Sequence, residues 1–556
     1  MTWPLFWTLY QISEWVIRVV MLVYVPQRRS PAAARAWLLL ILLIPSLGLV
    51  LYVLIGRPYL PRRRKAIHAR ISEVIRKEQE SRRLSRANAL AAAPVRSDSR
   101  GTRDDVTAGN AVGDLEASFD TRPMTAVAEP PAPTSEQAGA KHAGSPGSAP
   151  PDSARDLFRR PLTPFDLPPG FELPAEFSTV VALAQGLGDF EIMGGNAIEL
   201  LDGYDAAIDR LVADIDAARR HVHLLYYIFS DDVIGRRIVD ALRRAQRRGV
   251  ACRLMVDDAG SRNCIGTIER DLRAAGAEVV RVLPVSLWRR VSSARVDLRN
   301  HRKLAVIDGV VGYTGSQNVI DPAFKKPLVY EEVVVRAAGP VVAQLQAVFL
   351  ADHFVETAHG IRDAGMFPVT PAAGASPAQL LPSGPGYPHQ NLQRMIVSLL
   401  HAARHRVVIT TPYFIPDEPV LQAVQTAVLR GVEVHLVVSK QIDQFLVGLA
   451  QRSYYEDLLE AGVRIHSYTR RFLHAKHVSV DDDVALIGSS NMDIRSFVLN
   501  AEVMLVVYDR AVVARLRKIQ ERYFADSEEI TAEAWRARPG WHKVLQNVAR
   551  LADSLL

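Results

Sequence analysis

Cysteine is nearly absent from this sequence: Cys252 and Cys264 are the only two among 556 residues. Their spacing is not that of a zinc site, and two thiols cannot form a disulfide-rich scaffold, so we expect both to be reduced. Lysine is scarce beside arginine, and the formal net charge is +7. A basic chain of this kind favours anionic partners, which leaves nucleic acid and acidic lipid open.

Long uncharged apolar runs are also rare, and the clearest covers residues 36–56. Its length matches a ~30 Å hydrocarbon core, so it predicts a transmembrane helix with bends at Pro45 and Gly48. Residues 3–25 form a second predicted span, interrupted by Glu14 and Arg18, which lie one helical turn apart and can pair. An interfacial helix is the alternative for this segment. No basic region precedes it and no cleavage site follows it, which argues against a signal peptide.

Basic residues are distributed unevenly around these two segments. Arginines 28, 29 and 35 lie between them, whereas a larger cluster follows the second, at Arg57, Arg62, Arg63, Arg64, Lys65 and Arg70. The positive-inside rule therefore predicts a multi-pass protein whose remaining mass faces the cytoplasm. Residues 82–161 are rich in Ala, Pro, Ser and Gly, a composition that predicts a disordered linker.

The rest of the chain alternates short apolar strands with amphipathic helices, which is typical of an α/β fold. One order of elements occurs twice, with AARRHVHLLYYIF at 217–229 matching AARHRVVITTPYF at 402–414. We therefore predict two tandem α/β halves with pseudo-two-fold symmetry. The predicted divisions are a membrane hairpin (1–60), a juxtamembrane segment and linker (61–165), a first half (166–370) and a second half (371–556).

A charged octet is repeated within these halves: HRKLAVID begins at His301, and HAKHVSVD begins at His474. Side chains on a strand alternate between its faces, so each histidine shares a face with the lysine two residues later. These lysines are Lys303 and Lys476. The aspartates that end the octets, Asp308 and Asp481, point to the opposite face, which predicts a supporting role for them.

A second motif, GSxN, follows each octet at the same spacing. Its glycine-led turn, hydroxyl and amide suit phosphate oxygens, so Ser316 and Asn318 are predicted phosphate ligands, as are Ser489 and Asn491. Two halves facing each other would place two histidines about one phosphorus atom, one as nucleophile and one as acid and base. The lysines and asparagines would stabilise the phosphate charge, so this mechanism requires neither a metal nor another cofactor.

These paired motifs resemble the phospholipase D superfamily, over most of residues 195–556. The N-terminal SLGLVLYVLIGR, RNHRK at 299–303, TPYFIPD at 411–417 and GSSNMDIRSFVLNAE at 488–502 resemble bacterial cardiolipin synthases. The resemblance implies one active site shared by both halves and a phosphohistidine intermediate. It further implies that two phosphatidylglycerol molecules, which are anionic lipids of the inner membrane, are converted to cardiolipin and glycerol, and that no nucleic acid is bound.

The same resemblance implies a carboxylate that orients each histidine. Glu502 matches this position in the second half, and Glu332 is the candidate in the first, with Glu331 as its alternative. It also favours His301 as the nucleophile and His474 as the acid and base. A hydrolytic phospholipase D would use the same residues with water as acceptor, while a nuclease or a non-enzymatic membrane scaffold fits the motifs and hairpin less well.

The long linker suggests that the catalytic halves dock on the membrane through their own surface. Two segments are candidates for this contact: the arginine-rich residues 281–299 and the amphipathic C-terminal stretch HKVLQNVARLADSLL at 542–556.

Overall fold

The computed structural model describes residues 3–27, 31–56, 64–73, 75, 77, 167, 171–285, 297–361 and 365–551. The predicted linker lies outside these residues, as does the centre of the arginine-rich candidate segment, residues 286–296.

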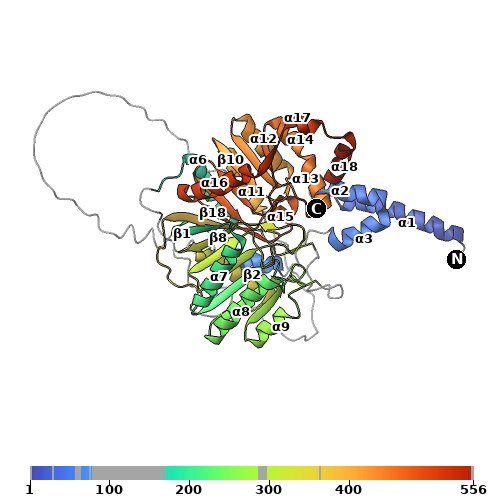
Figure 1. Ribbon diagram of the computed structural model, residues 1–556. Coiled ribbons are helices and arrows are strands. Elements are labelled where there is room, and N and C mark those ends of the chain that lie inside the picture. The colour runs from blue at the N-terminus through green and yellow to red at the C-terminus, as the bar shows by residue number, and fades with distance from the viewer. Residues whose placement is uncertain are drawn as a thin grey trace, which may run out of the picture. The chain divides into compact units, whose positions relative to one another are not determined.

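One mixed sheet of 15 strands runs through the described α/β region, in the order β19-β13-β12-β10-β15-β16-β18-β9-β1-β8-β6-β5-β2-β3-β4 (Figure 1). The strands before residue 371 are β1 (Met193–Leu201), β2 (His221–Tyr226), β3 (Ala251–Asp257), β4 (Glu278–Val282), β5 (Lys303–Ile307), β6 (Val311–Gly315) and β8 (Val334–Ala338). Those after it are β9 (Ser376–Ser383), β10 (Arg406–Thr410), β12 (Glu433–Ser439), β13 (Arg464–Tyr468), β15 (His477–Val480), β16 (Val484–Gly488), β18 (Glu502–Val507) and β19 (Ser527–Ile530).

The strand order reads as two mirrored sets that meet at the antiparallel pair of β1 and β9. From this junction outward, β8, β6, β5, β2, β3 and β4 correspond to β18, β16, β15, β10, β12 and β13. This arrangement is the predicted pair of α/β halves, and it brings β5 and β15, the strands that follow the two histidines, to equivalent places. Two small sheets add β7 (Tyr330–Glu331) beside β14 (Phe472–Leu473) and β11 (Phe414–Ile415) beside β17 (Met492–Asp493).

Helices cover both faces of this sheet. They are α6 (Ala175–Gly188), α7 (Tyr204–Ala217), α8 (Val233–Arg247), α9 (Ile268–Ala274), α10 (Val342–Thr357), α11 (Asn391–Ala402), α12 (Glu418–Leu429), α13 (Phe445–Ser453), α14 (Tyr455–Ala461), α15 (Ile494–Val498), α16 (Arg510–Ala525), α17 (Ala532–Arg536) and α18 (Gly540–Arg550). Three clusters of buried hydrophobic side chains lie between the sheet and these helices. One lies under α7, α8 and α9, one under α6, α11 and α12, and one under α10 and α16. Helix α6 precedes β1 but packs with α11, so the first half contributes a helix to the second and the halves do not fold as separate bodies.

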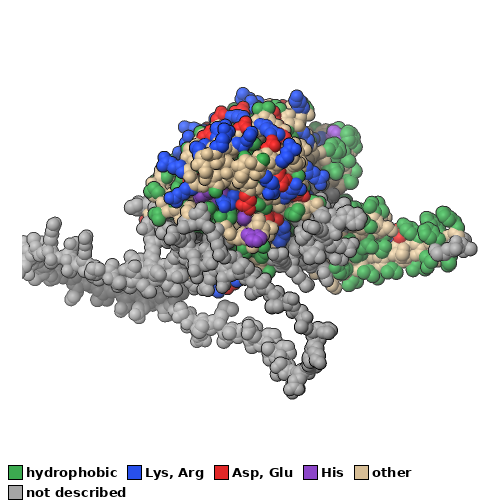
Figure 2. All heavy atoms as spheres, turned by 90° about the horizontal axis from the view of Figure 1, so that it is seen from below, with side chains coloured by type: hydrophobic (Ala, Val, Ile, Leu, Met, Phe, Trp, Pro, Cys, Tyr) green, Lys and Arg blue, Asp and Glu red, His purple; other side chains and the backbone are tan. Residues whose placement is uncertain are grey.

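The N-terminal helices differ from the predicted pair of spans. Helix α1 (Trp3–Tyr24) is one continuous helix, and its Leu5–Tyr24 segment is long and apolar enough to cross a membrane. Residues 36–56 are instead divided between α2 (Pro31–Leu43) and α3 (Pro45–Ile55), because Pro45 has no N–H to continue the helix. Hydrophobic side chains are exposed along these helices (Figure 2).

The chain folds back sharply between α2 and α3. A Cβ added at Gly48 would lie 2.8 Å from the Cα of Ile41, and the rings of Trp37 and Tyr52 are 5.3 Å apart. Residues seven and fifteen positions apart could not be so close in a straight helix. The prediction of one transmembrane helix over residues 36–56 is therefore wrong: proline and glycine produce a hairpin instead of a bend.

A helical segment at residues 64–73 packs on the α/β body, although it was predicted to be part of the connecting segment. Arg64 forms a two-pronged ion pair with Glu356, both largely buried, and Ile71 and Ile75 join the core under α10. His68 lies against Tyr387, with ring centroids 6.3 Å apart. The chain is thus attached to the body before the predicted linker begins, so the linker does not by itself separate the N-terminal helices from the active-site region.

Candidate active site

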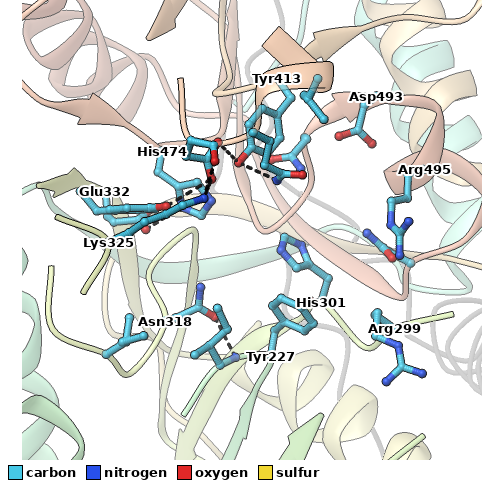
Figure 3. A pocket seen from close by; sticks show the side chains of 18 of the residues that line it. Tyr227, Arg299, His301, Asn318, Lys325, Glu332, Tyr413, His474, Asp493 and Arg495 are labelled. Atoms are coloured by element: carbon cyan, nitrogen blue, oxygen red, sulfur yellow. Dashed lines mark hydrogen bonds and ion pairs between the residues drawn. The ribbon is translucent and has the colours of Figure 1, made fainter. Parts of the chain in front are cut away.

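His301 and His474 lie across one cavity of about 450 Å³ (Figure 3). His301 lies just before β5 and His474 just before β15, so the symmetry of the sheet places both imidazoles at the cavity from opposite sides. The wall of the cavity also includes Tyr204, Tyr227, Arg299, Asn318, Lys325, Tyr330, Glu332, Tyr413, Asp443, Asn491, Asp493, Arg495 and Asn500.

Each histidine is paired with a glutamate from the other half. The Nδ1 atom of His301 lies 2.9 Å from Glu502 Oε1, and that of His474 lies 2.6 Å from Glu332 Oε1. A carboxylate at Nδ1 fixes the ring orientation and favours the tautomer with the proton on Nδ1. The Nε2 atom of each imidazole is thereby left for the cavity.

The backbone explains why the pairs cross. Residue 300 bridges residue 501 in a parallel arrangement, and the His301 amide donates to the Ala501 carbonyl at 2.9 Å. On the other side β14 runs parallel to β7, and the His474 amide donates to the Glu331 carbonyl at 2.8 Å. Sequence position predicts that each glutamate lies beside the histidine of its own half. That prediction is wrong, because each glutamate contacts the histidine of the other half.

Glu331, the alternative to Glu332, faces away from the histidine. Its carboxylate accepts a hydrogen bond from the Tyr468 hydroxyl at 2.7 Å, and only its backbone carbonyl contacts His474. Glu332 is thus the acid in contact with the imidazole.

Burial and the facing charges act in opposite directions on the pKa values of these pairs. Burial lowers the pKa of His301 to about 4 against the opposing pull of Glu502, and it also lowers the pKa of His474 against Glu332. Burial alone would raise the pKa of both glutamates, but the facing histidines, followed by nearby lysines, hold it below the usual range. Burial therefore opposes protonation of each imidazole, whereas the facing glutamate favours it.

Tyrosine rings support the two imidazoles, a feature that sequence patterns did not reveal. Tyr227 meets His301 edge to face at 4.8 Å between ring centroids, and Tyr330 meets His474 in the same way at 5.2 Å. Both contacts limit rotation of the imidazole about its side chain.

The two lysines are buried beside the histidines. Lys303 donates to the carbonyl of His301 at 2.7 Å, and Lys476 donates to that of His474 at 2.6 Å. Burial lowers the pKa of Lys303 to about 7 and that of Lys476 to about 8, although Glu502 and Glu332 oppose the change. A bound phosphodiester anion would favour their protonated forms.

The octet aspartates lie outside the cavity wall. The Asp308 carboxylate accepts three backbone N–H groups, from Arg219, Arg220 and His221, at 2.8–2.9 Å. Asp481 does the same for Arg404, His405 and Arg406. These bonds fix the starts of β2 and β10 against the histidine-bearing strands, as strand parity led us to expect.

The GSxN residues divide into two groups. Ser489 donates to Glu502 at 2.5 Å, and Ser316 exchanges hydrogen bonds with the backbone of Val333, so neither serine lines the cavity. This placement departs from their prediction as phosphate ligands, because their hydroxyls face the glutamate-bearing strands. Asn318 and Asn491 do line the cavity.

Polar groups that sequence reasoning missed occupy the cavity on either side of the histidines. Asp443 accepts hydrogen bonds from Tyr413 at 2.7 Å and Tyr330 at 3.3 Å, and its carboxylate lies 3.4 Å from Lys325. Arg299 and Arg495 lie elsewhere on the wall (Figure 3). Arg299 lies within RNHRK and Tyr413 within TPYF, whereas no sequence pattern indicated Asp443.

Known protein families and individual proteins resemble this chain in sequence. The sequence matches the family described as cardiolipin synthase, PLD-like domain, at residues 211–353 and 396–524, and the phospholipase D-nuclease N-terminal family at residues 15–57. Cardiolipin synthase A of Serratia proteamaculans is 37% identical over 371 residues, which cover 65% of this chain and 76% of that protein. Cardiolipin synthase A of Yersinia pseudotuberculosis is 36% identical with the same coverage.

The chain belongs to the phospholipase D-like cardiolipin synthase family. Among solved structures, a phosphatidylserine synthase of Haemophilus influenzae aligns with a TM-score of 0.53 and 14% identity, covering 68% of this chain and all of that one. At this identity the likeness concerns the fold alone, and it is the two-half α/β fold described above. The family's matched segments contain both octets and both GSxN motifs.

Proposed function

We propose that this phosphatidyltransferase is a cardiolipin synthase, which transfers a phosphatidyl group from one phosphatidylglycerol to the headgroup hydroxyl of another and releases glycerol. The observation that carries the proposal is the pair of imidazoles in one cavity, each held by a buried glutamate from the opposite half. The names and identity of its relatives support the lipid substrate. They favour transfer over the hydrolysis of membrane phospholipids.

In the first step, Nε2 of His301 attacks phosphorus and forms a P–N bond while the P–O bond to the glycerol headgroup breaks. His474 enters this step as an imidazolium, with Nδ1–H on Glu332, and its Nε2 gives a proton to the departing oxygen. Glu502 and Glu332 stabilise the positive charge that the imidazoles carry during the reaction. Lys303 and Lys476, which donate to the carbonyls of the two histidines, would add positive charge that favours a phosphate anion at the site.

In the second step, a hydroxyl of another phosphatidylglycerol loses its proton to His474 and attacks phosphorus. The P–N bond breaks, cardiolipin leaves, and both histidines return to their initial states. If water enters instead of the lipid hydroxyl, the product is phosphatidic acid. Exclusion of water thus decides between the two outcomes.

The assignment of His301 as nucleophile gains support from electrostatics. Its pKa falls to about 4, so it keeps the free lone pair that an attacking nitrogen needs. His474 has the shorter contact with its glutamate, 2.6 Å, which favours the protonated form required of an acid.

Purified protein with phosphatidylglycerol in detergent micelles tests the function, with products followed by mass spectrometry. Cardiolipin and glycerol in equal amounts are expected. Phosphatidic acid alone would identify a hydrolase, and no lipid turnover would refute both activities.

Histidine variants test the shared site. His301→Ala and His474→Ala should each abolish turnover, whereas His401→Ala, at an exposed position on α11, should retain it. Substantial activity in either of the first two variants would contradict a mechanism that needs both imidazoles.

We also propose that the chain crosses the inner membrane once, through α1, and that α2 and α3 form a re-entrant hairpin. At 13 and 11 residues these helices extend about 20 Å and 16 Å, short of a ~30 Å core. A returning hairpin puts the arginines at 28–35 and the cluster at 57–70 on one side, which agrees better with the positive-inside rule than two crossings do. That side would be the cytoplasm.

The charges inside α1 support this topology. Arg18 lies 3.7 Å from Glu14 and donates to the carbonyl of Leu42 at 3.2 Å, next to the break between α2 and α3. A carbonyl freed by a helix break within a membrane needs such a donor, so the arginine has a structural reason to be there.

Cysteine labelling distinguishes the two topologies. Single cysteines placed at positions 29 and 60 should both react with an impermeant maleimide from the cytoplasmic side, since native Cys252 and Cys264 are buried. Reaction from opposite sides would establish two crossings instead.

A further inference from the structure

The C-terminal helix α18 exposes its apolar face. Trp541 and Val544 are each 64% exposed and Val548 is 57% exposed, while Gln546 and Ala549 are buried against the body. These three apolar residues recur at positions i, i+3 and i+7, so they form one stripe along the helix. A helix that merely completed a soluble core would turn this stripe inward.

Ion pairs hold the helix in this orientation. Lys543 donates to Glu456 at 3.0 Å, Arg550 donates to Asp457 at 3.0 Å, and Arg538, just before the helix, donates to Glu456 at 2.9 Å. The polar side is therefore fastened to α14, and the apolar side stays free of the described body.

Helix α13 extends the apolar surface to the mouth of the active site. It packs against α18, and Phe445 and Leu446 at its start are 69% and 57% exposed. Ile442 lies over Gly448 and is partly exposed beside them. The next residues, Asp443, Gln444 and Val447, line the cavity.

We propose that this surface, made of Ile442, Phe445, Leu446, Trp541, Val544 and Val548 and here called the α13–α18 face, inserts into the surface of the lipid bilayer that holds the substrate. The inference rests on the proposed lipid substrate. A phosphatidylglycerol headgroup must reach the histidines while its acyl chains remain in an apolar environment. A membrane-seated apolar rim continuous with the cavity wall lets the lipid enter without exposing those chains to water.

The identity of the exposed residues fits a bilayer better than a protein partner. Tryptophan is favoured at the membrane–water interface, where its ring sits at headgroup level. An amphipathic helix buries its apolar face only ~5–10 Å into this region, which the single stripe of α18 can do without unfolding. Exposed apolar patches of this kind mark sites of contact with a membrane or with another protein. Because this one is continuous with the wall of the active-site cavity, a membrane is the better match.

Quenching by brominated lipids tests the contact directly. The full-length protein in phosphatidylglycerol-containing vesicles is labelled at Val544→Cys with an environment-sensitive fluorophore, and the lipids carry bromine on their acyl chains. Leu429→Cys is the matched control, because Leu429 is apolar and 83% exposed on α12, outside the α13–α18 face. We expect roughly twofold or greater quenching at position 544 and little at position 429.

Activity on two forms of substrate tests whether the α13–α18 face helps membrane lipid to enter the active site. A variant with Trp541→Ser and Val544→Ser should lose about tenfold in kcat/KM on phosphatidylglycerol in vesicles, yet match the unsubstituted protein on a monomeric short-chain phosphatidylglycerol. Leu429→Ser should behave as the unsubstituted protein in both assays.

Equal quenching at the two labelled positions would overturn the proposal, as would equal activity loss on both substrates. Shielding of position 544 that depends on protein concentration but not on bromine would assign the face to a second copy and overturn it too. If the unsubstituted protein makes no cardiolipin from either substrate, the proposed function fails, while the quenching result still decides the membrane contact.

Discussion

Replacing Glu332 by glutamine tests the crossed pairing of acids and histidines most sharply. Glu332 lies 2.6 Å from His474 and is 4% exposed, and its charge raises the histidine pKa against burial. Without that charge His474 holds its proton less well and becomes a poorer acid. Loss of a charged hydrogen bond costs about 1.5–3 kcal/mol, which corresponds to roughly a 10- to 150-fold slower turnover of phosphatidylglycerol.

The leaving group shows which histidine has been weakened. A nitrophenyl ester of phosphatidic acid needs no proton to release its alcohol, so Glu332→Gln should form the phosphohistidine from this ester at nearly the normal rate. Glu502→Gln should stay slow with both substrates, because Glu502 holds the nucleophile His301. Nitrophenol release measured by stopped-flow absorbance gives both rates.

The opposite pattern would refute the reasoning. If each glutamate served the histidine of its own half, the ester would rescue Glu502→Gln and leave Glu332→Gln slow. Equal rescue of both variants would mean that neither glutamate acts through a particular histidine.

Three other predictions concern the surroundings of the site. Asp352→Ala should destabilise the fold by about 3–5 kcal/mol in chemical unfolding, because it strands the buried Arg302 guanidinium; a change below ~1 kcal/mol would contradict this. Burial lowers the pKa of His477 to about 3, so the folded state resists protonation of this ring. The free energy of unfolding should therefore fall as pH drops below 6.5, by on the order of a few kcal/mol before pH 3. His477→Gln should make melting less dependent on pH in this range. Asp443→Asn should weaken the Tyr413 contact at the cavity wall and raise the ratio of phosphatidic acid to cardiolipin in product analysis, and an unchanged ratio would exclude a role in acceptor choice.

The chemistry-bearing residues were largely predictable from sequence, because they occur in short patterns whose geometry is local. Alternation along a strand predicts Lys303 beside His301 and Asp308 on the opposite face; in the structure Lys303 donates to the His301 carbonyl, and Asp308 accepts backbone N–H groups outside the cavity wall. The repeat of one element order likewise predicted two halves, since each half forms from neighbouring segments of the chain.

Only the tertiary structure decided which groups meet. The crossing of Glu502 to His301 depends on a parallel contact between segments two hundred residues apart, and no local periodicity records such a pairing. Asp443 likewise contacts Lys325 and Tyr330 of the other half, which are far from it in the sequence. Residues 36–56 are as apolar as a membrane span, yet the loss of one N–H at Pro45 and the space left by Gly48 let the helices fold against each other. The amphipathic pattern of α18 predicted a helix, but whether its apolar stripe faced the core or the outside was settled by the ion pairs that fasten its polar side.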